Sequence, residues 1–115
     1  MVKRIVANIR TNNLSKADLF YQEILELEVL MDYGWIKTLG NGEEAKVQIS
    51  FAEEGGNETE VPDLSIEVDN VDEIYDKMKN AGFEIKYQLT HEDWGVRRFF
   101  VEDPFGKLIN ILTHL

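Results

Sequence analysis

The chain has 115 residues, 43% of them hydrophobic and 30% charged, which is the composition of one globular domain rather than of a disordered or fibrous protein. Its formal net charge of −10 opposes the phosphate backbone, so we expect no nucleic-acid partner. No apolar run reaches the ~18 residues of a membrane span, and cysteine is absent. We therefore expect a cytoplasmic protein with no membrane segment, disulfide or thiolate metal site.

The first half of the chain predicts a strand, a helix and three further strands. Apolar and polar residues alternate over 3–10, the period of a strand with two different faces. Ser15 then predicts a helix N-cap with Asp18 at the third helical position, and apolar residues follow at helical spacing. The three β-rich stretches are 29–33, 35–39 and 46–52, with an Asn41-Gly42 hairpin turn before the last.

The second half predicts the same succession. Alternation over 64–68 indicates a strand, Asn70 with Glu73 a helix cap, and Gly82 the end of that helix. Three more strands are predicted at 83–87, 96–101 and 107–113, the last two joined by the turn Asp103-Pro104-Phe105-Gly106.

The two halves repeat at an offset of about 57 residues, with Thr11-Asn12-Asn13-Leu14 over Val68-Asp69-Asn70-Val71. Between them, the acidic segment 53–60 carries two glycines and no large apolar residue, as a linker does. We therefore predict an α+β fold of two βαβββ modules, 1–54 and 61–115, joined by this linker within a single domain.

The end of the chain carries the most specific motif. Residues Glu92 to Ile111 contain a Trp-Gly strand entrance, an Asp-Pro-x-Gly turn and a final strand, and they resemble the glyoxalase/bleomycin-resistance/dioxygenase group, or vicinal oxygen chelate superfamily. The segments 68–72 and 82–85 also match, so the resemblance spans nearly the whole chain. It implies a half-open curved sheet with helices on the convex side, a ligand groove on the concave side, and a homodimer, as in many single-domain members.

The metal-dependent members of that family use four ligands, mostly His, Glu or Gln. The resemblance places those positions at Val6, Gln48, Asp63 and Asn110. Valine has no donor atom, and two amides with one carboxylate are a poor set for a transition ion. The two histidines do not complete it, since we expect His91 in a loop and His114 at a mobile terminus. We therefore expect no metal, no other cofactor and no catalytic residue.

The strand face opposite the apolar one carries mostly amides and hydroxyls. Its residues are Val6, Asn8, Gln48, Ser50, Asp63, Ser65, Glu67, Leu108, Asn110 and Leu112. Uncharged hydrogen-bonding groups mixed with apolar ones suit a partly enclosed pocket, the alternative being a merely solvated face.

Two tryptophans could wall such a pocket. In bleomycin-resistance-like members an equivalent of Trp94-Gly95 lines the groove, and Trp35 offers a second flat surface; core or dimer packing is the alternative for both. Tyr33, Arg97 and Arg98 are candidate rim groups, or the arginines form local salt bridges. We predict that the ligand-binding residues are Trp35, Gln48, Ser50, Asp63, Trp94 and Asn110.

The sequence leaves three functions open. The first is a metal-independent, homodimeric small-molecule-binding protein of the bleomycin-resistance-like type, which holds an aromatic or cationic ligand on the concave face. The second is a divergent lyase, isomerase or dioxygenase with a weak or atypical metal site, or an enzyme that uses Asp63 as a base. The third is a regulatory or protein-interaction module.

Overall fold

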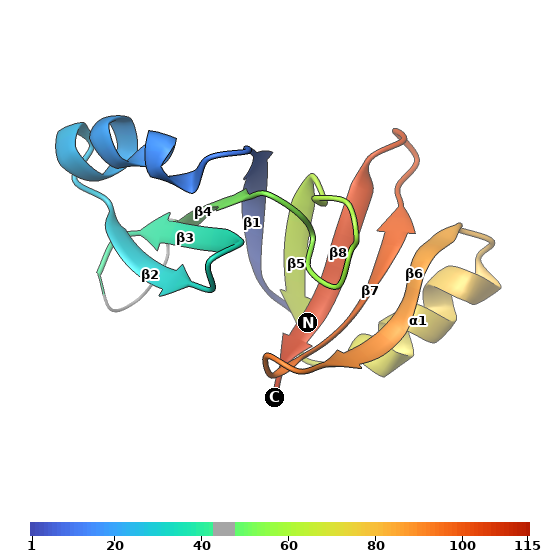
Figure 1. Cartoon of the computed structure of the whole chain (residues 1–115). Helices are drawn as coiled ribbons and strands as arrows, with labels where there is room; N and C mark the ends of the chain where they lie inside the picture. Colours follow the sequence, from blue (N-terminus) through green and yellow to red (C-terminus); the bar gives the residue numbers. More distant parts are fainter. Residues whose placement is uncertain (43–47) are drawn as a thin grey trace. The chain divides into compact units, whose positions relative to one another are not determined.

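A computed structural model describes residues 1–42 and 48–115 (Figure 1). Its elements are β1 (Val2–Arg10), η1 (Leu14–Lys16), η2 (Asp18–Ile24), β2 (Glu28–Asp32), β3 (Ile36–Gly40), β4 (Gln48–Ala52), β5 (Leu64–Val68), α1 (Val71–Asn80), β6 (Ile85–Glu92), β7 (Val96–Glu102) and β8 (Leu108–His114). The predicted hairpin turn at Asn41-Gly42 leads into positions 43–47, which lie outside the described residues and include the first two residues of the strand predicted over 46–52.

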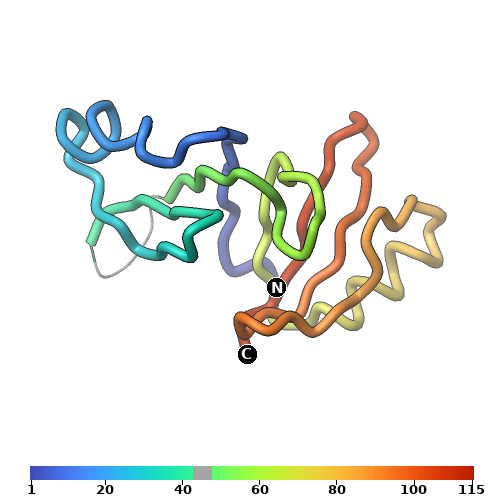
Figure 2. The backbone as a smooth tube through the Cα atoms, viewed as in Figure 1, coloured from blue at the N-terminus to red at the C-terminus, as the bar shows by residue number. Residues whose placement is uncertain are grey.

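Contacts along the chain divide it into two units, and the division falls inside β1. Met1–Ile5 belongs with Pro62–Leu115, which we call the C-terminal unit, and Val6–Val61 forms the N-terminal unit. The predicted module boundaries at 54 and 61 stay predictions. Figure 2 shows both chain ends close together, as expected when residues 1–5 and 108–115 belong to one unit.

In the C-terminal unit the strands run in the order β1-β5-β8-β7-β6. β5 and β8 are parallel, whereas β8, β7 and β6 pair antiparallel. One side of this sheet packs against α1 through the buried residues Val68, Val71, Phe99, Val101, Ile109 and Ile111. The helix starts and ends as predicted: Asn70 is its N-cap, and Gly82 follows it with φ of +87°.

Strand β6 is longer than the sequence indicates. The predicted strand was 83–87, but pairing with β7 continues to Glu92 opposite Val96, and His91 lies opposite Arg97. The expectation of a loop at His91 is therefore wrong. Pairing with the long, mostly buried β7 extends the strand beyond its apolar residues, because the ladder hydrogen bonds outweigh local propensity.

In the N-terminal unit the order is β2-β3-β4-β1, with β1 and β4 parallel. Its buried cluster is smaller and contains Ala17, Leu39 and Phe51. The predicted Ser15 cap is wrong, because the Asn13 carboxamide accepts hydrogen bonds from both the Ser15 amide (3.1 Å) and the Ser15 hydroxyl (2.6 Å). The cap thus lies at Asn13, and η1 starts at Leu14.

The acidic segment 53–60 folds into a tight turn of its own. The Gly55 amide donates to the Thr59 carbonyl (2.7 Å), and the Thr59 amide donates to the Gly56 carbonyl (3.1 Å). Gly56, Asn57 and Glu58 all have positive φ, of 85°, 52° and 64°. A left-handed turn of this kind is costly for a residue with a Cβ, so its hydrogen bonds must hold it in place.

The predicted fold class is confirmed. The chain forms an open mixed sheet and repeats the order of one strand, a helical segment and three strands. The repeat extends to the parallel pairing of β1 with β4 and of β5 with β8. Within the described part of the chain, every helix falls short of the length and apolarity that a membrane crossing needs.

Candidate functional site

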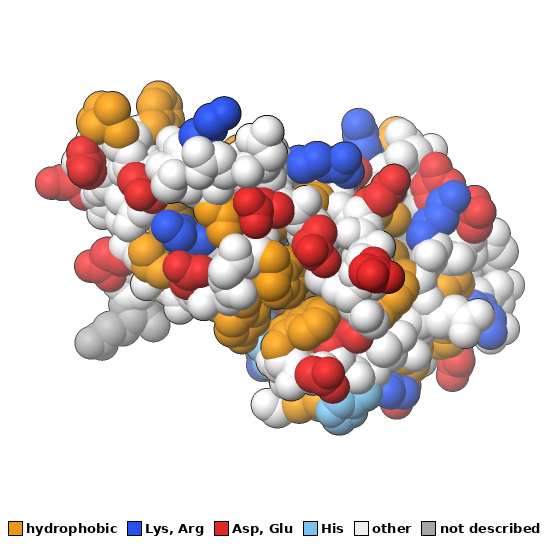
Figure 3. Space-filling view, in the orientation of Figure 1, with side chains coloured by type: hydrophobic (Ala, Val, Ile, Leu, Met, Phe, Trp, Pro, Cys, Tyr) orange, Lys and Arg blue, Asp and Glu red, His pale blue; other side chains and the backbone are white. Residues whose placement is uncertain are grey.

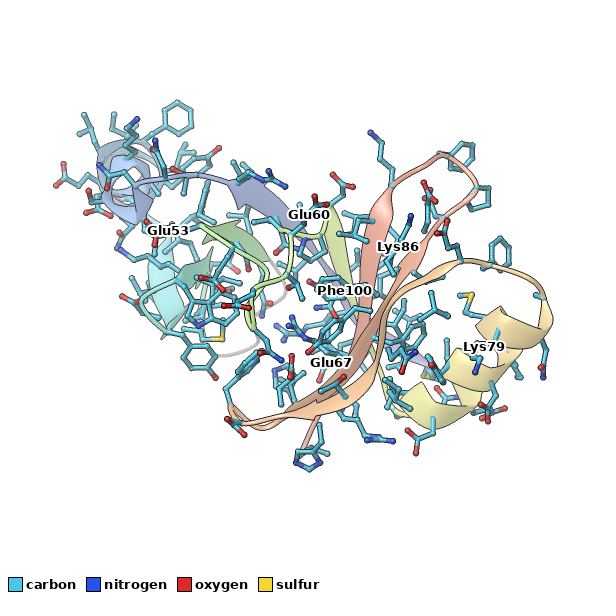
Figure 4. All side chains as sticks on the ribbon, turned by 45° about the vertical axis from the view of Figure 1, so that its right-hand side comes forward. Glu53, Glu60, Glu67, Lys79, Lys86 and Phe100 are labelled. Carbon is cyan, nitrogen blue, oxygen red and sulfur yellow. The ribbon has the colours of Figure 1, made fainter. Side chains whose placement is uncertain are left out.

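The candidate site lies on the side of the C-terminal sheet that faces away from α1. Phe99 and Val101 pack toward the helix, so Arg98 and Phe100 on the same strand project to the opposite face. By the same alternation, Asn110 on β8 and Glu67 on β5 point to this face. Figure 4 shows Phe100 and Glu67 on the sheet and Lys79 on the separate helix.

A buried ion pair occupies the β6–β7 part of this face. Arg98 and Glu92 are only 3% and 4% exposed. The Glu92 Oε2 atom lies 2.7 Å from Arg98 Nη2 and 2.8 Å from Arg98 Nε. The Tyr87 hydroxyl also donates toward this carboxylate, at 3.1 Å and 3.2 Å from its two oxygens. The two buried charges thus compensate each other.

Three aromatic rings surround the same guanidinium. The Arg98 Cζ atom lies 4.8 Å from the ring centroid of Phe100, 5.0 Å from that of Trp94 and 5.2 Å from that of Tyr87. Cation–π attraction of this kind strengthens when the cation is desolvated. The pair therefore fixes three flat side chains relative to one another, and Trp94, half-buried, lies at the edge of the group.

Arg98 was expected either at the rim of a groove or in a local salt bridge, and the structure bears out the salt bridge. The cluster with Glu92 and Tyr87 was missed. A usable signal was present: Arg98 lies between Val96 and Phe100 on one face of a strand, and a charge among large apolar residues requires an acid as partner.

Asn110 lies beside this cluster and is 7% exposed. It is paired in register with Phe100 on β7 and with Ser65 on β5. Its Nδ2 donates to the Ser65 hydroxyl at 3.1 Å, whereas its Oδ1 is buried and has no partner among the described residues. A buried acceptor without a donor is unusual in a folded protein.

At the other end of β5 and β8, Glu67 contacts two cationic or ionisable groups. One carboxylate oxygen lies 2.6 Å from Arg4 Nε, and the other lies 2.7 Å from His114 Nδ1. Burial opposes ionisation of Glu67, but the hydrogen bonds from His114 and Arg4 outweigh it and hold the pKa below its ordinary value of 4.5. The expected mobile terminus at His114 is thus an ordered strand end.

The structure places the six predicted ligand-binding residues in both units. Asp63, Trp94 and Asn110 belong to the C-terminal unit, and Trp35, Gln48 and Ser50 to the N-terminal unit. Ser50 is buried and its hydroxyl lies 2.7 Å from that of Thr38. Trp35 directly precedes β3, Gln48 is the first residue of β4, and both are half-buried. Their role in binding stays a prediction.

Asp63 has a bonding role that the sequence did not indicate. Its Oδ2 accepts a hydrogen bond from the Leu108 amide at 2.9 Å, and its own amide donates to the Leu108 carbonyl at 2.8 Å. These two bonds close the start of the β5–β8 pair. The carboxylate of Asp63 therefore stabilises the entry of β8, although its side chain is exposed.

The family's metal positions do not fit a metal here. Val6 is buried and has no donor atom, Asp63 already accepts the Leu108 amide, and Gln48 and Asn110 contribute only amides. Across residues 1–42 and 48–115, no three His, Asp or Glu side chains come together as a cation site would need.

The family model described as "Glyoxalase/Bleomycin resistance protein/Dioxygenase superfamily" matches residues 3–111. No curated protein matches the sequence. Three solved structures share the fold. One is described as an NAD-dependent benzaldehyde dehydrogenase from Legionella pneumophila (TM-score 0.74, 15% identity, 97% of this chain and 100% of that one). Another is a glyoxalase/bleomycin resistance protein/dioxygenase superfamily member from Vibrio splendidus 12B01 (TM-score 0.71, 15% identity, 98% of this chain and 99% of that one). The third is a single-residue variant of Streptomyces coelicolor methylmalonyl-CoA epimerase in complex with 2-nitronate-propionyl-CoA (TM-score 0.71, 15% identity, 99% of this chain and 99% of that one).

Proposed function

We propose that this chain, which belongs to the Glyoxalase/Bleomycin resistance protein/Dioxygenase superfamily, is a small-molecule-binding protein that needs no metal. The observation that carries this proposal is the group of Tyr87, Trp94 and Phe100 rings around the Glu92–Arg98 pair. A face of rigid rings beside a few polar groups suits a planar ligand.

The charge of the site favours neutral or cationic ligands over anionic ones. Arg98 is the cation nearest to the rings, and Glu92 compensates it at 2.7 Å. The chain as a whole carries a formal charge of −10, which attracts cations and repels anions before contact. We therefore propose an aromatic or cationic ligand, bound in the cytoplasm.

Tryptophan fluorescence tests this proposal directly. In a Trp35→Phe variant all tryptophan emission comes from Trp94, which contacts Arg98. Titration with the planar cation N-methylquinolinium should change this emission with a saturable curve, and naphthalene-2-sulfonate should do so at least tenfold more weakly. A Trp94→Leu variant, followed by calorimetry, is the matched control. Linear, unsaturable quenching by both compounds would contradict the proposal.

We also propose that the protein forms a homodimer, as members of its superfamily commonly do. Several large apolar side chains of the N-terminal unit are exposed and available for such contact: Leu19, Phe20, Ile24, Leu25 and Val29. Figure 3 shows hydrophobic atoms at the surface over the helical segment that Figure 1 draws in blue. An exposed group of this size marks an interaction surface. Sedimentation velocity should give twice the monomer mass of 13.3 kDa, and Phe20→Glu should lower it.

An enzyme is the second candidate, and one observation favours it. His114 Nδ1 is held at 2.7 Å by Glu67, an arrangement that leaves Nε2 to accept a proton. Incubation with 2-oxo compounds in D2O, followed by NMR, would reveal proton exchange at carbon. Loss of exchange in His114→Gln with retained folding would support an enzyme, whereas no exchange in the wild type would count against it.

A further inference from the structure

Asn110 presents a hydrogen-bond acceptor that nothing in the described chain satisfies. Its side chain is 7% exposed, so bulk water does not reach the amide freely. Nδ2 donates to the Ser65 hydroxyl at 3.1 Å, and Oδ1 has no partner. Because a desolvated carbonyl without a donor is unfavourable, the site lacks one hydrogen-bond donor.

Other buried polar side chains of the molecule do not share this deficiency. Thr38 and Ser50 bond to each other at 2.7 Å, and Glu92 and Arg98 form their ion pair. Among the described residues, the other side-chain atom without a partner is Asn70 Oδ1, which belongs to a half-buried residue at the start of α1, on a different part of the unit. The free acceptor of Asn110 is therefore specific to the candidate site.

The surroundings of Oδ1 define what kind of group could approach it. Phe100 is the β7 residue paired with Asn110, and Leu108 and Leu112 flank it on the same face of β8. Apart from the Ser65 hydroxyl on β5, which Nδ2 already contacts, the neighbours are thus one aromatic ring and two aliphatic side chains. A group that satisfies Oδ1 here must be attached to a largely apolar molecule, because a strongly hydrated ion would lose more water than one carbonyl replaces.

We infer that Asn110 is a specificity-determining residue whose Oδ1 accepts a hydrogen bond from an N–H or O–H group at the edge of a planar aromatic ligand. This inference rests on the proposed binding function and narrows its ligand class. A ring packed near Phe100 directs its edge at the amide, and the free acceptor selects rings that carry a donor over rings that do not. A site built to form one hydrogen bond rejects an analogue that leaves it unmade.

The matched probes indole and benzofuran test this inference, since they have nearly the same shape and differ in the ring N–H. In isothermal titration calorimetry of the full chain, indole should bind about tenfold more tightly than benzofuran. In Asn110→Leu, which keeps the side-chain volume, the ratio should fall to about one. In Asn110→Asp, which keeps an acceptor, indole should remain preferred. Asn70→Ala, which removes the other unpartnered amide, should leave the ratio unchanged.

Each outcome separates this inference from the function on which it rests. Equal binding of the two probes by the wild type would overturn the role of Asn110 and leave the aromatic site standing. Tighter binding of benzofuran would mean that the amide presents its NH2 group, and would also overturn it. Binding of neither probe would overturn this inference, and the Trp94 emission with N-methylquinolinium would then decide the binding function by itself. If Asn110→Leu fails to fold by circular dichroism, the Asn110→Asp ratio decides: a loss of preference for indole contradicts the inference.

Discussion

The two units follow one order of elements, but their helical segments differ in quality. In the C-terminal unit α1 is a regular helix, with Asp72 and Glu73 in its first turn, Lys77 and Lys79 in its last, and a Glu73–Lys77 ion pair of 3.0 Å. Those charges complement the helix dipole. In the N-terminal unit the segment breaks into η1 and η2, and the last turn of η2 carries no basic residue.

The end of η2 adds a further difference. The Leu25 amide donates to the Phe20 carbonyl and the Leu27 amide to the Tyr21 carbonyl, which closes a wide last turn. Glu26 takes a φ of +59° there, where a glycine would fit without strain. The corresponding position after α1 is Gly82. The C-terminal unit is thus locally consistent with its fold, and the N-terminal unit depends more on tertiary contacts.

The largest expected effect concerns the larger core. Phe99→Ala removes a fully buried ring from the cluster under α1, and we expect it to lower the free energy of unfolding by about 3–5 kcal/mol. Leu39→Ala, at an equally buried position of the N-terminal unit, should cost about 2–3 kcal/mol, because its smaller cluster can relax. Urea unfolding measures both. A larger loss at Leu39 would reverse the ranking of the units.

Breaking the buried ion pair comes next. Glu92→Gln leaves the Arg98 charge desolvated, so the free energy of unfolding should fall by about 3 kcal/mol. The double variant Glu92→Leu/Arg98→Met, which removes both charges, should recover most of that loss in the same urea experiment. Equal costs for the single and the double variant would show that the pair contributes through packing rather than charge.

The turn at 53–60 tests how the N-terminal unit is held. A Cβ on Gly55 would collide with the Glu60 carbonyl oxygen and the Thr59 hydroxyl, so Gly55→Ala should cost about 1–3 kcal/mol. Gly34→Ala is the control: its new Cβ meets no atom, and only the positive φ of 86° is unfavourable, for about 1 kcal/mol. Thermal unfolding should rank the two in that order, and the opposite order would contradict the turn geometry.

The C-terminal unit should also be sensitive to acid through Glu67. Its pKa is lowered in the folded state, so its contribution to stability is complete above the ordinary value of 4.5 and is lost as the pH falls through the folded value. Glu67→Gln should cost about 1–2 kcal/mol at pH 7 by weakening the bonds to Arg4 and His114. The variant should lose less stability than the wild type as the pH falls below the ordinary carboxyl value of 4.5. If the free energy of unfolding of the wild type and of Glu67→Gln fell in parallel with pH, this role of Glu67 would be contradicted.

The smallest expected effect is a gain. Glu26→Gly relieves the strain of the left-handed backbone after η2, although glycine also raises the entropy of the unfolded chain. The net effect should stabilise the protein by about 0.5–1 kcal/mol. Hydrogen exchange should slow at the amides of η2 while α1 is unchanged. Destabilisation by this variant would mean that the Glu26 side chain makes a contribution larger than its backbone strain.

Alternation and turn chemistry were sufficient to predict the strands and their repeat. Asn70 and Gly82 bound α1 as expected, because capping depends on a few local residues. The N-cap of η1 was misplaced, since Asn13 and Ser15 are both good caps and local pattern does not choose between them. The extension of β6 to Glu92 depends on its partner strand, which no local window contains.

The candidate site was predictable only in part. The face of β8 that carries Asn110 followed from a period of two, and Trp94 from a family motif. Glu92, the partner of Arg98, lies 6 residues away along the chain, and Arg4, a partner of Glu67, lies 63 residues away. Spacing along the chain does not indicate such pairs. Nor could sequence show that the Asn110 amide is only half satisfied, because that depends on the exact placement of Ser65.

The division of the chain inside β1 bears on how the protein is made. Residues 1–5 are synthesised before residues 62–115, which complete their unit. Arg4 and Glu67 are 63 positions apart, so the first strand stays half paired until β5 is synthesised. A nascent chain whose first strand still lacks its β5 neighbour is open to chaperones and to neighbouring chains. Moving residues 1–5 behind residue 115 by circular permutation would give this strand its partners at once.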